Sequence, residues 1–283
     1  MKKVLVTGGA GFIGSNLIKE LSKKNYNIIS LDNYSTGNIN NEVEGVTYIN
    51  ADITKIDSLD TDFDLCFHLA AQSRVQPSFE NPEESFRVNV LGTTKVMEFA
   101  KKNNIKVTYA GSSSKHHDPS DSPYAMYKYL GEQVCKLYKK SYNVNVQIAR
   151  FYNVYGPGES IDEKYGNVIG IWRSKVLNGE PLPIVGDGNQ KRDFVHVYDI
   201  VDGLVKIALS ELNHEDAWEL GTGINYSINE LFNYFKDKFN VTSIIIPDQP
   251  GNYRQTLREN DDSLKLLGWE PMDRLKDHIN NFN

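Results

Sequence analysis

Residues 1–14 read MKKVLVTGGAGFIG, and the rest of the chain can be interpreted from this stretch. A short apolar run, Val4–Val6, stops at a group of glycines. Apolar residues then recur at helical spacing from Phe12 to Leu21. This succession of patterns predicts a strand, a tight turn and a helix.

The glycines of this turn have separate mechanical roles. Gly8 allows a turn that a β-carbon would obstruct, Gly11 lets the backbone approach a pyrophosphate, and Gly14 lets the helix pack closely on the strand. The pyrophosphate would lie at the helix N-terminus, held by free N–H groups. A glycine-rich turn can also serve packing alone, so the pattern needs support from its context. The cofactor-binding residues expected here are Gly8, Gly11, Phe12, Ile13 and Gly14.

A second apolar segment, Ile28–Leu31, ends in Asp32. An acidic side chain at this position of a dinucleotide-binding unit accepts hydrogen bonds from the adenosine ribose. It would also repel a 2′-phosphate, and no Arg or Lys lies between Asp32 and Asn41 to compensate. The sequence therefore predicts NAD rather than NADP as the cofactor, with Asn33 also expected at the site.

Composition excludes several classes of protein. The chain has 283 residues, a formal net charge of −6 and a pI near 5.6, so no basic excess is available to bind nucleic acid or a membrane surface. No apolar run approaches the roughly 18 residues of a membrane span. Met1–Lys3 leads directly into the first strand, so we expect no signal peptide and a cytoplasmic protein in which Cys66 and Cys135 are reduced.

Strand and helix patterns alternate along the chain and predict an α/β fold. We expect a Rossmann-type doubly wound parallel sheet over 1–153 and a smaller C-terminal α/β lobe over 154–283, from which some segments return to the first domain. The strands expected in the first domain, after the two above, are 46–49, 65–69, 105–110 and 144–150, with helices at 82–102 and 123–142. The lobe is expected to contain helices 168–177, 200–209 and 228–239 and strands 183–185 and 243–246.

Several residues follow predicted strands, where ligands of open parallel sheets bind. Asp52 would either bond the adenine amino group or cap the next helix, and the pattern does not decide between the two. Apolar neighbours surround His68, which we interpret as a core histidine. Ala70 and Ala71 suggest that the backbone passes close to something flat. The cofactor-binding residues predicted in these segments are Asp52, Ile53, Leu69, Ala70 and Ala71.

Ser112 and Ser113 follow another predicted strand, and the next helix carries Tyr124 and Lys128. A spacing of four places the tyrosine and the lysine on one helix face. A free tyrosine, with a pKa of about 10, is a poor base at neutral pH, but a neighbouring ammonium group would lower that value. Tyr124 could then take a proton from a sugar hydroxyl. Tyr127 faces elsewhere on the helix.

The motifs occur in a fixed order along nearly the whole chain: Thr7–Gly14 (TGGAGFIG), Asp32, His68–Ala71 (HLAA), the serines, Tyr124-x-x-x-Lys128, Arg150–Asn153 (RFYN) and Arg192–Phe194 (RDF). In this series the chain resembles the extended short-chain dehydrogenase/reductases that act on nucleotide sugars. It is most similar to NAD-dependent 4-epimerases, including those of UDP-galactose and UDP-N-acetylglucosamine.

The resemblance implies a role for each motif residue. Tyr124 would deprotonate the sugar 4-hydroxyl as C4 passes a hydride to NAD, and Lys128 would lower the pKa of that tyrosine and bond the nicotinamide ribose. Ser112 and Ser113 would bond the 4-oxygen, with the dominant serine left open. The 4-keto sugar would turn over and receive the hydride on its other face.

The resemblance also implies substrate contacts and a quaternary structure. Asn153 and Arg192 would hold the diphosphate of a nucleotide-diphosphate sugar, most simply a UDP-sugar. Arg254 and Val168 are expected to contribute further substrate contacts. Relatives dimerise through two helices that correspond here to 82–102 and 123–142, so a homodimer is expected.

The chain departs from the family pattern at three places. Only residues 115–123 separate the serines from Tyr124, which is expected to remove one wall of the active site. Gln249–Asn252 replaces an Arg-x-Gly-Asp motif, so a diphosphate contact is lost or supplied by Arg254. Arg74 stands where relatives often have a small residue, and it would either read an acidic sugar or lie in solvent. The adjacent histidines His116 and His117, with Asp118, are not expected to bind a metal.

Four alternatives to epimerisation follow from the same residues. A 4,6-dehydratase would need a carboxylate next to the serines, which this chain lacks. Decarboxylation of a uronic acid stays open, because a 4-keto intermediate loses carbon dioxide readily. A reductase using NADPH conflicts with Asp32, and a non-catalytic NAD-binding or NAD-sensing protein would not need the tyrosine, lysine and serines together.

Thr256, at a gatekeeper position of relatives, is small enough to admit an acetamido group.

Overall fold

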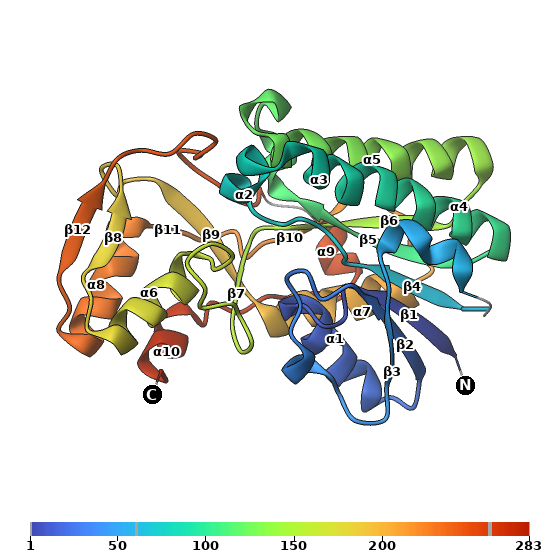
Figure 1. The fold of residues 1–283 in the computed structure, drawn as a ribbon, viewed down its shortest axis with the longest axis horizontal. Coiled ribbons are helices and arrows are strands. Elements are labelled where there is room, and N and C mark those ends of the chain that lie inside the picture. Colours follow the sequence, from blue (N-terminus) through green and yellow to red (C-terminus); the bar gives the residue numbers. More distant parts are fainter. Residues whose placement is uncertain (1, 60–61, 260–261, 283) are drawn as a thin grey trace.

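A parallel sheet of seven strands forms the larger part of the computed structural model, which describes residues 2–59, 62–259 and 262–282 (Figure 1). Its strand order is β10-β6-β5-β4-β1-β2-β3, and every neighbouring pair runs parallel. The strands are β1 (Lys3–Thr7), β2 (Asn27–Asp32), β3 (Thr47–Asn50), β4 (Leu65–His68), β5 (Lys106–Ser112), β6 (Val146–Phe151) and β10 (Trp218–Leu220). The order reverses between β1 and β4, and ligands of such sheets bind at that crevice.

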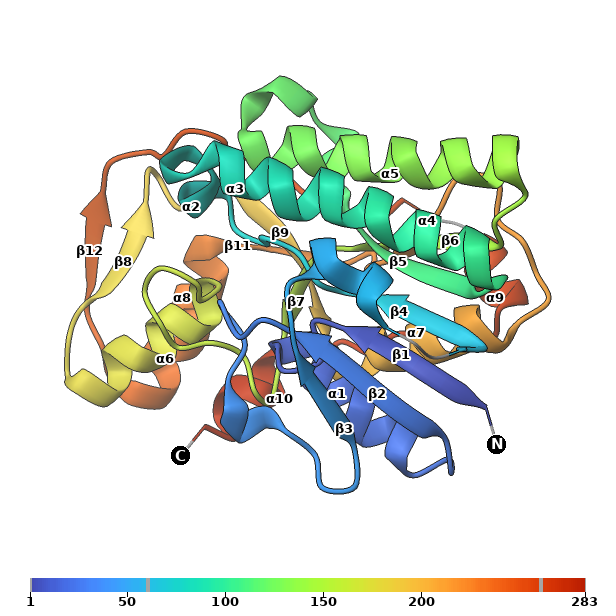
Figure 2. The same ribbon diagram turned by 45° about the vertical axis from the view of Figure 1, so that its right-hand side comes forward.

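Helices cover both faces of this sheet (Figure 2). One face carries α2 (Val75–Glu80), α3 (Pro82–Phe86), α4 (Thr93–Asn103) and α5 (Pro123–Tyr142), and a π-helical turn over Arg87–Gly92 joins α3 to α4. The other face carries α1 (Phe12–Ser22) and α7 (Val197–Leu209). Each layer buries the apolar stripe of its helices, such as Leu17 and Ile18 of α1 and Val96 and Met97 of α4, all at 0% exposure. This burial is the main favourable contribution to the stability of such a sandwich.

Two segments from the second half of the chain belong to the large sheet. Strand β10 pairs with β6 and forms its edge. Helix α7, which the sequence pattern places in the lobe, instead packs beside α1 on the sheet, and its Ile200, Leu204 and Ile207 lie in the same apolar cluster as Leu17. Strand β10 and helix α7 therefore pack with the large sheet, although both follow residue 153 in the chain.

The lobe lies at the left of Figure 1, beyond the carboxyl ends of the strands. It contains β7 (Asn153–Tyr155), α6 (Val168–Asn178), β8 (Leu182–Val185), β9 (Lys191–His196), β11 (Asn225–Ser227), α8 (Ile228–Phe239), β12 (Ser243–Ile246) and α10 (Leu275–Asn280). Two small sheets, β11-β9-β7 and β12-β8, frame it. Aromatic residues fill its core, where Trp172 meets Phe235 edge to face with ring centroids 5.4 Å apart. A short helix, α9 (Asp262–Leu266), packs near β10.

The structure confirms the predicted Rossmann-type fold and its long elements. The strands that the sequence pattern missed, β7, β9, β10 and β11, have three to six residues, and several carry charged or polar side chains. His68 is a core histidine, with its ring nitrogens 2.8 Å from Thr7 Oγ1 and 3.1 Å from Thr93 Oγ1. Cys66 and Cys135 are free and buried.

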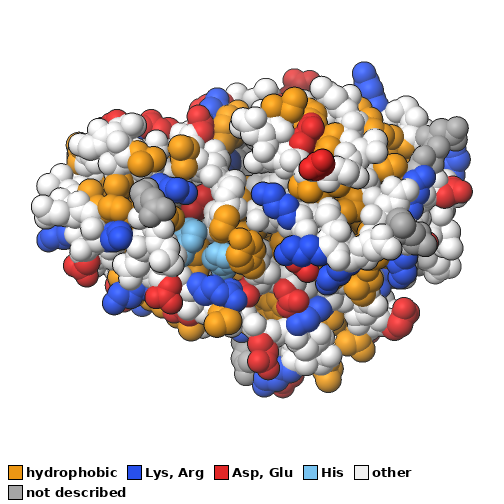
Figure 3. Space-filling model, turned by 90° about the horizontal axis from the view of Figure 1, so that it is seen from below, with side chains coloured by type: hydrophobic (Ala, Val, Ile, Leu, Met, Phe, Trp, Pro, Cys, Tyr) orange, Lys and Arg blue, Asp and Glu red, His pale blue; other side chains and the backbone are white. Residues whose placement is uncertain are grey.

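The lower face of the molecule carries charges of both signs (Figure 3). Figure 3 shows acidic and basic side chains interspersed over the lower face of the molecule. In the parts of the chain that the structure describes, no helix has the length and apolar character needed to cross a membrane.

Candidate active site

A cleft of about 1240 Å³ runs between the carboxyl ends of the central strands and the lobe. It collects most of the residues that the sequence marked as functional. The predicted residues that line it are Gly8, Gly11, Phe12, Ile13, Gly14, Asp32, Asn33, Ile53, Leu69, Ala70, Ala71, Ser112, Ser113, Tyr124, Lys128, Asn153 and Arg192. Three predicted residues do not line it: Asp52, Val168 and Arg254.

The glycine turn has the geometry that a pyrophosphate site requires. Gly8 has φ +75°, and a β-carbon on it would lie 2.8 Å from the Ala70 nitrogen. A β-carbon on Gly14 would lie 2.1 Å from the Gly8 oxygen, so only glycine permits this packing of helix on strand. Gly11 caps α1 without a side-chain hydrogen bond, and the first turn carries no acidic residue. The N–H groups in the first turn of α1 are therefore available to an anion.

Asp32 lies at the end of β2, with its two oxygens held by backbone donors. The Ala10 nitrogen donates to Oδ2 at 2.9 Å and the Tyr34 nitrogen to Oδ1 at 2.8 Å. Burial raises the pKa of Asp32, while these two bonds act to lower it. Beside it the cleft is lined by Asn33, Ser35, Thr36, Gly37, Asn38 and Asn41. This end is uncharged apart from the carboxylate, which fits a ribose and not a ribose phosphate.

Asp52 acts as a helix cap, which was one of its two predicted roles. Its Oδ1 accepts from the Thr54 nitrogen at 2.8 Å, and its Oδ2 lies 2.7 Å from Arg87 Nη2. The hydrogen bonds from Arg87 hold the pKa of Asp52 well below its usual range. The geometry favours this role over adenine binding, because the carboxylate is occupied by Arg87 and lies outside the cleft lining.

Tyr124 and Ser112 meet at the centre of the cleft. The Tyr124 hydroxyl donates to Ser112 Oγ at 3.2 Å, and the Ser114 hydroxyl donates to the same atom at 2.9 Å. Ser112 is therefore the serine next to the tyrosine, whereas Ser113 lines the cleft beside it. Ser114 also lines the cleft, although sequence reasoning did not single it out. Its position in the Ser112–Ser114 run was the available signal.

Lys128 lies one helical turn along α5 from Tyr124 and is buried at 5% exposure. Its ammonium group donates to the Ala110 carbonyl and lies 4.7 Å from the centre of the Tyr109 ring. Burial lowers the pKa of Lys128 to about 8, although the charge of Glu132 acts in the opposite direction.

The pKa of Tyr124 differs from the expectation drawn from its spacing to Lys128. Burial raises the pKa of the Tyr124 phenol. The influences that lower it are the hydrogen bond with Ser112 and the charge of Arg74, while Glu132 raises it. The expected lowering by Lys128 does not appear among them, and the Lys128 ammonium group donates to the Ala110 carbonyl.

Behind this group lies a network of charges centred on Arg150. The guanidinium bonds Glu132 at 2.8 Å, Asp216 at 2.6 Å and Glu219 at 2.7 Å. Burial acts to lower the pKa of Arg150, but its carboxylate partners raise it overall. Glu132 connects this network to the cleft, since it lies on the same helix as Tyr124 and Lys128.

The lobe supplies the other wall of the cleft. Arg192 bonds the Lys191 carbonyl at 2.9 Å and the Asn252 side chain. Burial lowers the pKa of Arg192 to about 10. Asn153 donates to Thr256 Oγ1 at 3.0 Å, so the hydroxyl at the predicted gatekeeper position ties β7 to the C-terminal segment.

Arg254 and Val168 lie outside the cleft. The Arg254 guanidinium pairs with Asp187 at 3.0 Å and its side chain is 73% exposed. The pairing Lys191 N to Arg254 O fixes this segment along β9, and the side chain meets the acidic turn instead of the cleft. Val168 begins α6 and packs against the core of the lobe, whereas its neighbours Asn167 and Ile171 line the cleft.

The wall that the short loop was expected to remove is provided by the C-terminal segment 249–253. His117 stacks on Tyr253 with ring centroids 3.8 Å apart. Gln76 donates to the Pro250 carbonyl at 2.9 Å. Residues of this segment line the cleft: Gln249, Gly251, Asn252 and Tyr253. His116 points to a different partner, Glu219, at 3.0 Å, so the two histidines do not converge, and no metal-binding group of three such side chains occurs among the described residues.

Comparisons with known proteins agree with this geometry. Residues 4–221 match the NAD dependent epimerase/dehydratase family. A putative UDP-glucose 4-epimerase from Methanocaldococcus jannaschii is 38% identical over 98% of this chain and 95% of its own. An epimerase from Methanothermobacter thermautotrophicus superposes with a TM-score of 0.91 at 32% identity, covering 98% and 90% of the two chains. A UDP-glucose 4-epimerase from Thermus thermophilus, solved with NAD, gives a TM-score of 0.87 at 26% identity over 98% and 96%.

The chain belongs to the NAD dependent epimerase/dehydratase family, and its cofactor is NAD. Three features of the cleft fit that cofactor. They are the glycine turn, the buried Lys128 and Asp32, whose surroundings suit a ribose without a phosphate.

Proposed function

We propose that the protein is an NAD-dependent 4-epimerase of nucleotide-diphosphate sugars, with a UDP-sugar as the substrate. The observation that carries the proposal is the contact between the Tyr124 hydroxyl and Ser112 Oγ inside the cleft, beside Lys128. Ser112 Oγ accepts from the Tyr124 and Ser114 hydroxyls and from the Ser114 nitrogen, so a proton relay between the hydroxyl oxygens is available.

The residues divide the reaction between them. Tyr124 takes the proton of the sugar 4-hydroxyl, and Ser112 orients that oxygen. Bound NAD would accept the hydride from C4, return it to the other face of the ketone, and add positive charge beside the phenol. In this proposal Lys128 would bond the nicotinamide ribose, and Asn153 and Arg192 would bind the diphosphate. The same tyrosine returns the proton after the 4-keto sugar has turned over.

A 4,6-dehydratase is less well supported, because no carboxylate hydrogen-bonds to Tyr124, Ser112 or Ser114 within the described part of the chain. Uronate decarboxylation shares the same first step and is separated from epimerisation by its product.

The proposal is tested by incubating the purified protein with NAD and UDP-glucose and following the sugar by NMR. We expect interconversion with the 4-epimer. Tyr124→Phe should reduce kcat by about 10²- to 10⁴-fold, because it removes the proton acceptor. Tyr127→Phe is the matched control, since that ring contacts Phe86 and lies outside the cleft lining. Wild-type turnover by the Tyr124 variant would contradict the mechanism.

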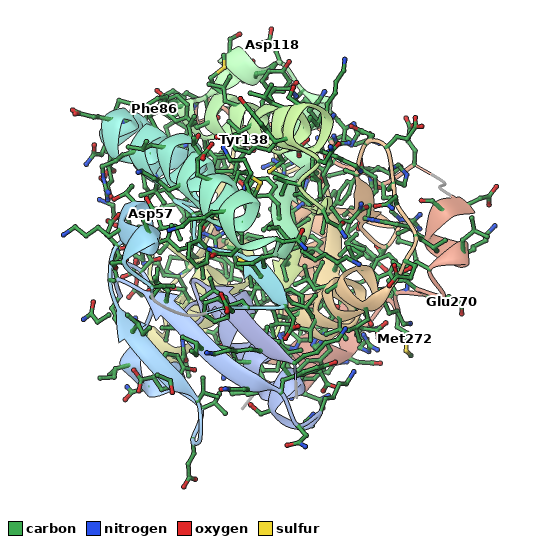
Figure 4. All side chains as sticks on the ribbon, turned by 90° about the vertical axis from the view of Figure 1, so that its right-hand side faces the viewer. Asp57, Phe86, Asp118, Tyr138, Glu270 and Met272 are labelled. Carbon is green, nitrogen blue, oxygen red and sulfur yellow. The ribbon has the colours of Figure 1, made fainter. Side chains whose placement is uncertain are left out.

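We also propose a homodimer formed through α3–α5. Exposed apolar side chains lie along these helices: Phe86 (44%), Leu91 (41%), Leu137 (53%) and Tyr142 (50%). Figure 4 shows Phe86 at the outer edge of this helical layer. Such a group of exposed apolar residues supports an interface. Sedimentation equilibrium should give twice the 32.1 kDa chain mass, and a monomer at micromolar concentration would contradict the proposal.

A further inference from the structure

Four cationic side chains line the described part of the cleft: Arg74, Lys128, Lys164 and Arg192. Three of them have partners or roles already given. Lys128 bonds a carbonyl at the cofactor end, Lys164 pairs with Glu80 at 2.5 Å, and Arg192 is held by Asn252 in the lobe. Arg74 has a single hydrogen bond to the described part of the chain, from Nε to the Tyr165 carbonyl at 2.7 Å. Within the described residues its two terminal nitrogens bond no protein group.

The position of Arg74 is fixed by its surroundings. It immediately precedes α2, whose Ser78 hydroxyl accepts from the Tyr124 nitrogen at 3.0 Å. Gln76 of the same helix binds the Pro250 carbonyl in the C-terminal wall. Helix α2 is therefore held between α5 and the C-terminal wall, and Arg74, just before it, lines the same cleft as Tyr124. The charge of Arg74 also acts on the pKa of the Tyr124 phenol, against the larger effect of burial.

Among residues 2–59, 62–259 and 262–282, no carboxylate bonds this guanidinium. The carboxylate whose charge acts to raise the pKa of Arg74 is Glu159, which is buried at 8% exposure. Its Oε2 accepts from Asn167 at 2.9 Å, and its Oε1 lies 3.5 Å from His278 Nε2. Burial lowers the pKa of Arg74. A partly desolvated cation without a bonded anion is costly, and an anionic ligand would offset that cost.

We propose that Arg74 binds a carboxylate on the sugar ring, so that the preferred substrate is a nucleotide-linked uronic acid. The inference rests on the proposed function, because it assumes that C4 of the sugar lies at Tyr124. In a hexuronate the carboxylate is carried by C5, the next ring carbon. The two free nitrogens of Arg74 form a planar fork that suits bidentate binding of this group. A neutral hexose would leave the fork unpaired.

The same contact favours epimerisation over decarboxylation. Loss of carbon dioxide breaks the C5–C6 bond, leaves the electron pair at C5 of the 4-keto sugar and removes the negative charge from the carboxyl group. A guanidinium bonded to the carboxylate stabilises the charged group before carbon dioxide leaves. It does not stabilise the neutral carbon dioxide, so the contact disfavours this step. The expected product is therefore the 4-epimeric uronate, with its carboxyl group retained.

The test compares UDP-glucuronate with UDP-glucose in two measurements. Binding is measured by calorimetry on Tyr124→Phe protein saturated with NAD, so that it does not depend on turnover, and products of the wild-type protein are followed by NMR. We expect Arg74→Gln to weaken UDP-glucuronate binding by about 10- to 100-fold, the loss of a charge-assisted bidentate contact. UDP-glucose binding should change less than about twofold, because it makes no such contact. Arg74→Lys should restore part of the loss.

Lys95→Gln is the matched control. It also removes one positive charge, but Lys95 lies on α4 in an exposed ion pair with Asp57. An equal loss for both sugars in Arg74→Gln would make Arg74 a diphosphate contact and overturn the inference, as would no loss for either. Release of carbon dioxide and a pentose would overturn the assignment to epimerisation. If the wild-type protein turned over neither sugar, the proposed function would fail, whereas the binding comparison would still decide the carboxylate contact.

Discussion

Arg150 is buried and Arg74 is half-buried, and the surroundings of the two guanidinium groups differ. Arg150, at 1% exposure, is bonded to three carboxylates, and the combination raises its pKa. Arg74 bonds one backbone carbonyl, and burial lowers its pKa. The protein compensates the first charge completely and leaves the second available to a ligand. Lys128 and Tyr124 resemble Arg74 in this respect, because within the described residues neither is bonded to a group of opposite charge. Side chains in such surroundings are available to bind or react.

The largest effect on stability is expected from Arg150→Met, which removes the guanidinium whose charge the three carboxylates compensate. The change leaves Glu132, whose side chain is 1% exposed, without its partner. Removing one member of a buried pair costs about 3–5 kcal/mol. Urea unfolding should report this loss. A change below about 1 kcal/mol, the range of surface pairs, would mean that the network is not the structural unit described here.

Lys128→Met tests a charge that no carboxylate of the described chain compensates, and we expect it to affect activity more than stability. We expect kcat to fall by about 10²- to 10³-fold, as for other placed polar groups in active sites. The melting temperature should stay the same or rise, because burial already disfavours the charged form of this lysine and lowers its pKa to about 8. Lys140→Met, on the exposed side of the same helix, is the control. A destabilised but active variant would reverse the comparison.

The smallest effect is expected at the outer end of the Arg150 network, where His116 meets Glu219. The hydrogen bond with Glu219 raises the pKa of His116 above its ordinary value. Its stabilising contribution is therefore fully present below the unfolded-state pKa of about 6.5 and is lost as pH rises through the folded-state pKa. The melting temperature of the wild type minus that of His116→Gln should be larger at acidic than at alkaline pH. A difference that grows toward alkaline pH would contradict this sign.

The wild type must be compared with His116→Gln because His68 changes the stability with pH in the opposite direction. Burial lowers the pKa of His68 to about 3. Folding is therefore opposed as pH falls from about 6.5 toward that value, since the unfolded chain takes up the proton first. His116→Gln leaves this second effect in place, so the difference between the two proteins isolates the His116 contribution.

Much of the site could be predicted because its signals are local. Gly8, Gly11 and Gly14 lie within one turn, and the spacing of Tyr124 and Lys128 places them on one helix face. Asp32 follows from its strand end. Local backbone geometry decides such positions, so the sequence pattern alone predicted both the glycine turn and the cofactor.

Long-range contacts decided what the sequence left open. Asp52 was resolved by Arg87, thirty-five positions away, and Ser112 was separated from Ser113 by the direction of its side chain toward Tyr124. Arg254 was misplaced because an ion pair with Asp187 holds it outside the cleft. The missing wall beside the short loop was filled by a segment more than a hundred residues later.

The sequence by itself thus determined the fold, the family resemblance, the cofactor and the central tyrosine, lysine and serine residues. Those features depend on period, spacing and residue type over a few helical turns or strand ends. Only the tertiary structure decided which charges are compensated. The sequence does not distinguish Arg150 from Arg74, because the carboxylates that bond Arg150 come from the second half of the chain. Asp216 lies just before strand β10 and Glu219 lies within it, and β10 pairs with the strand of Arg150.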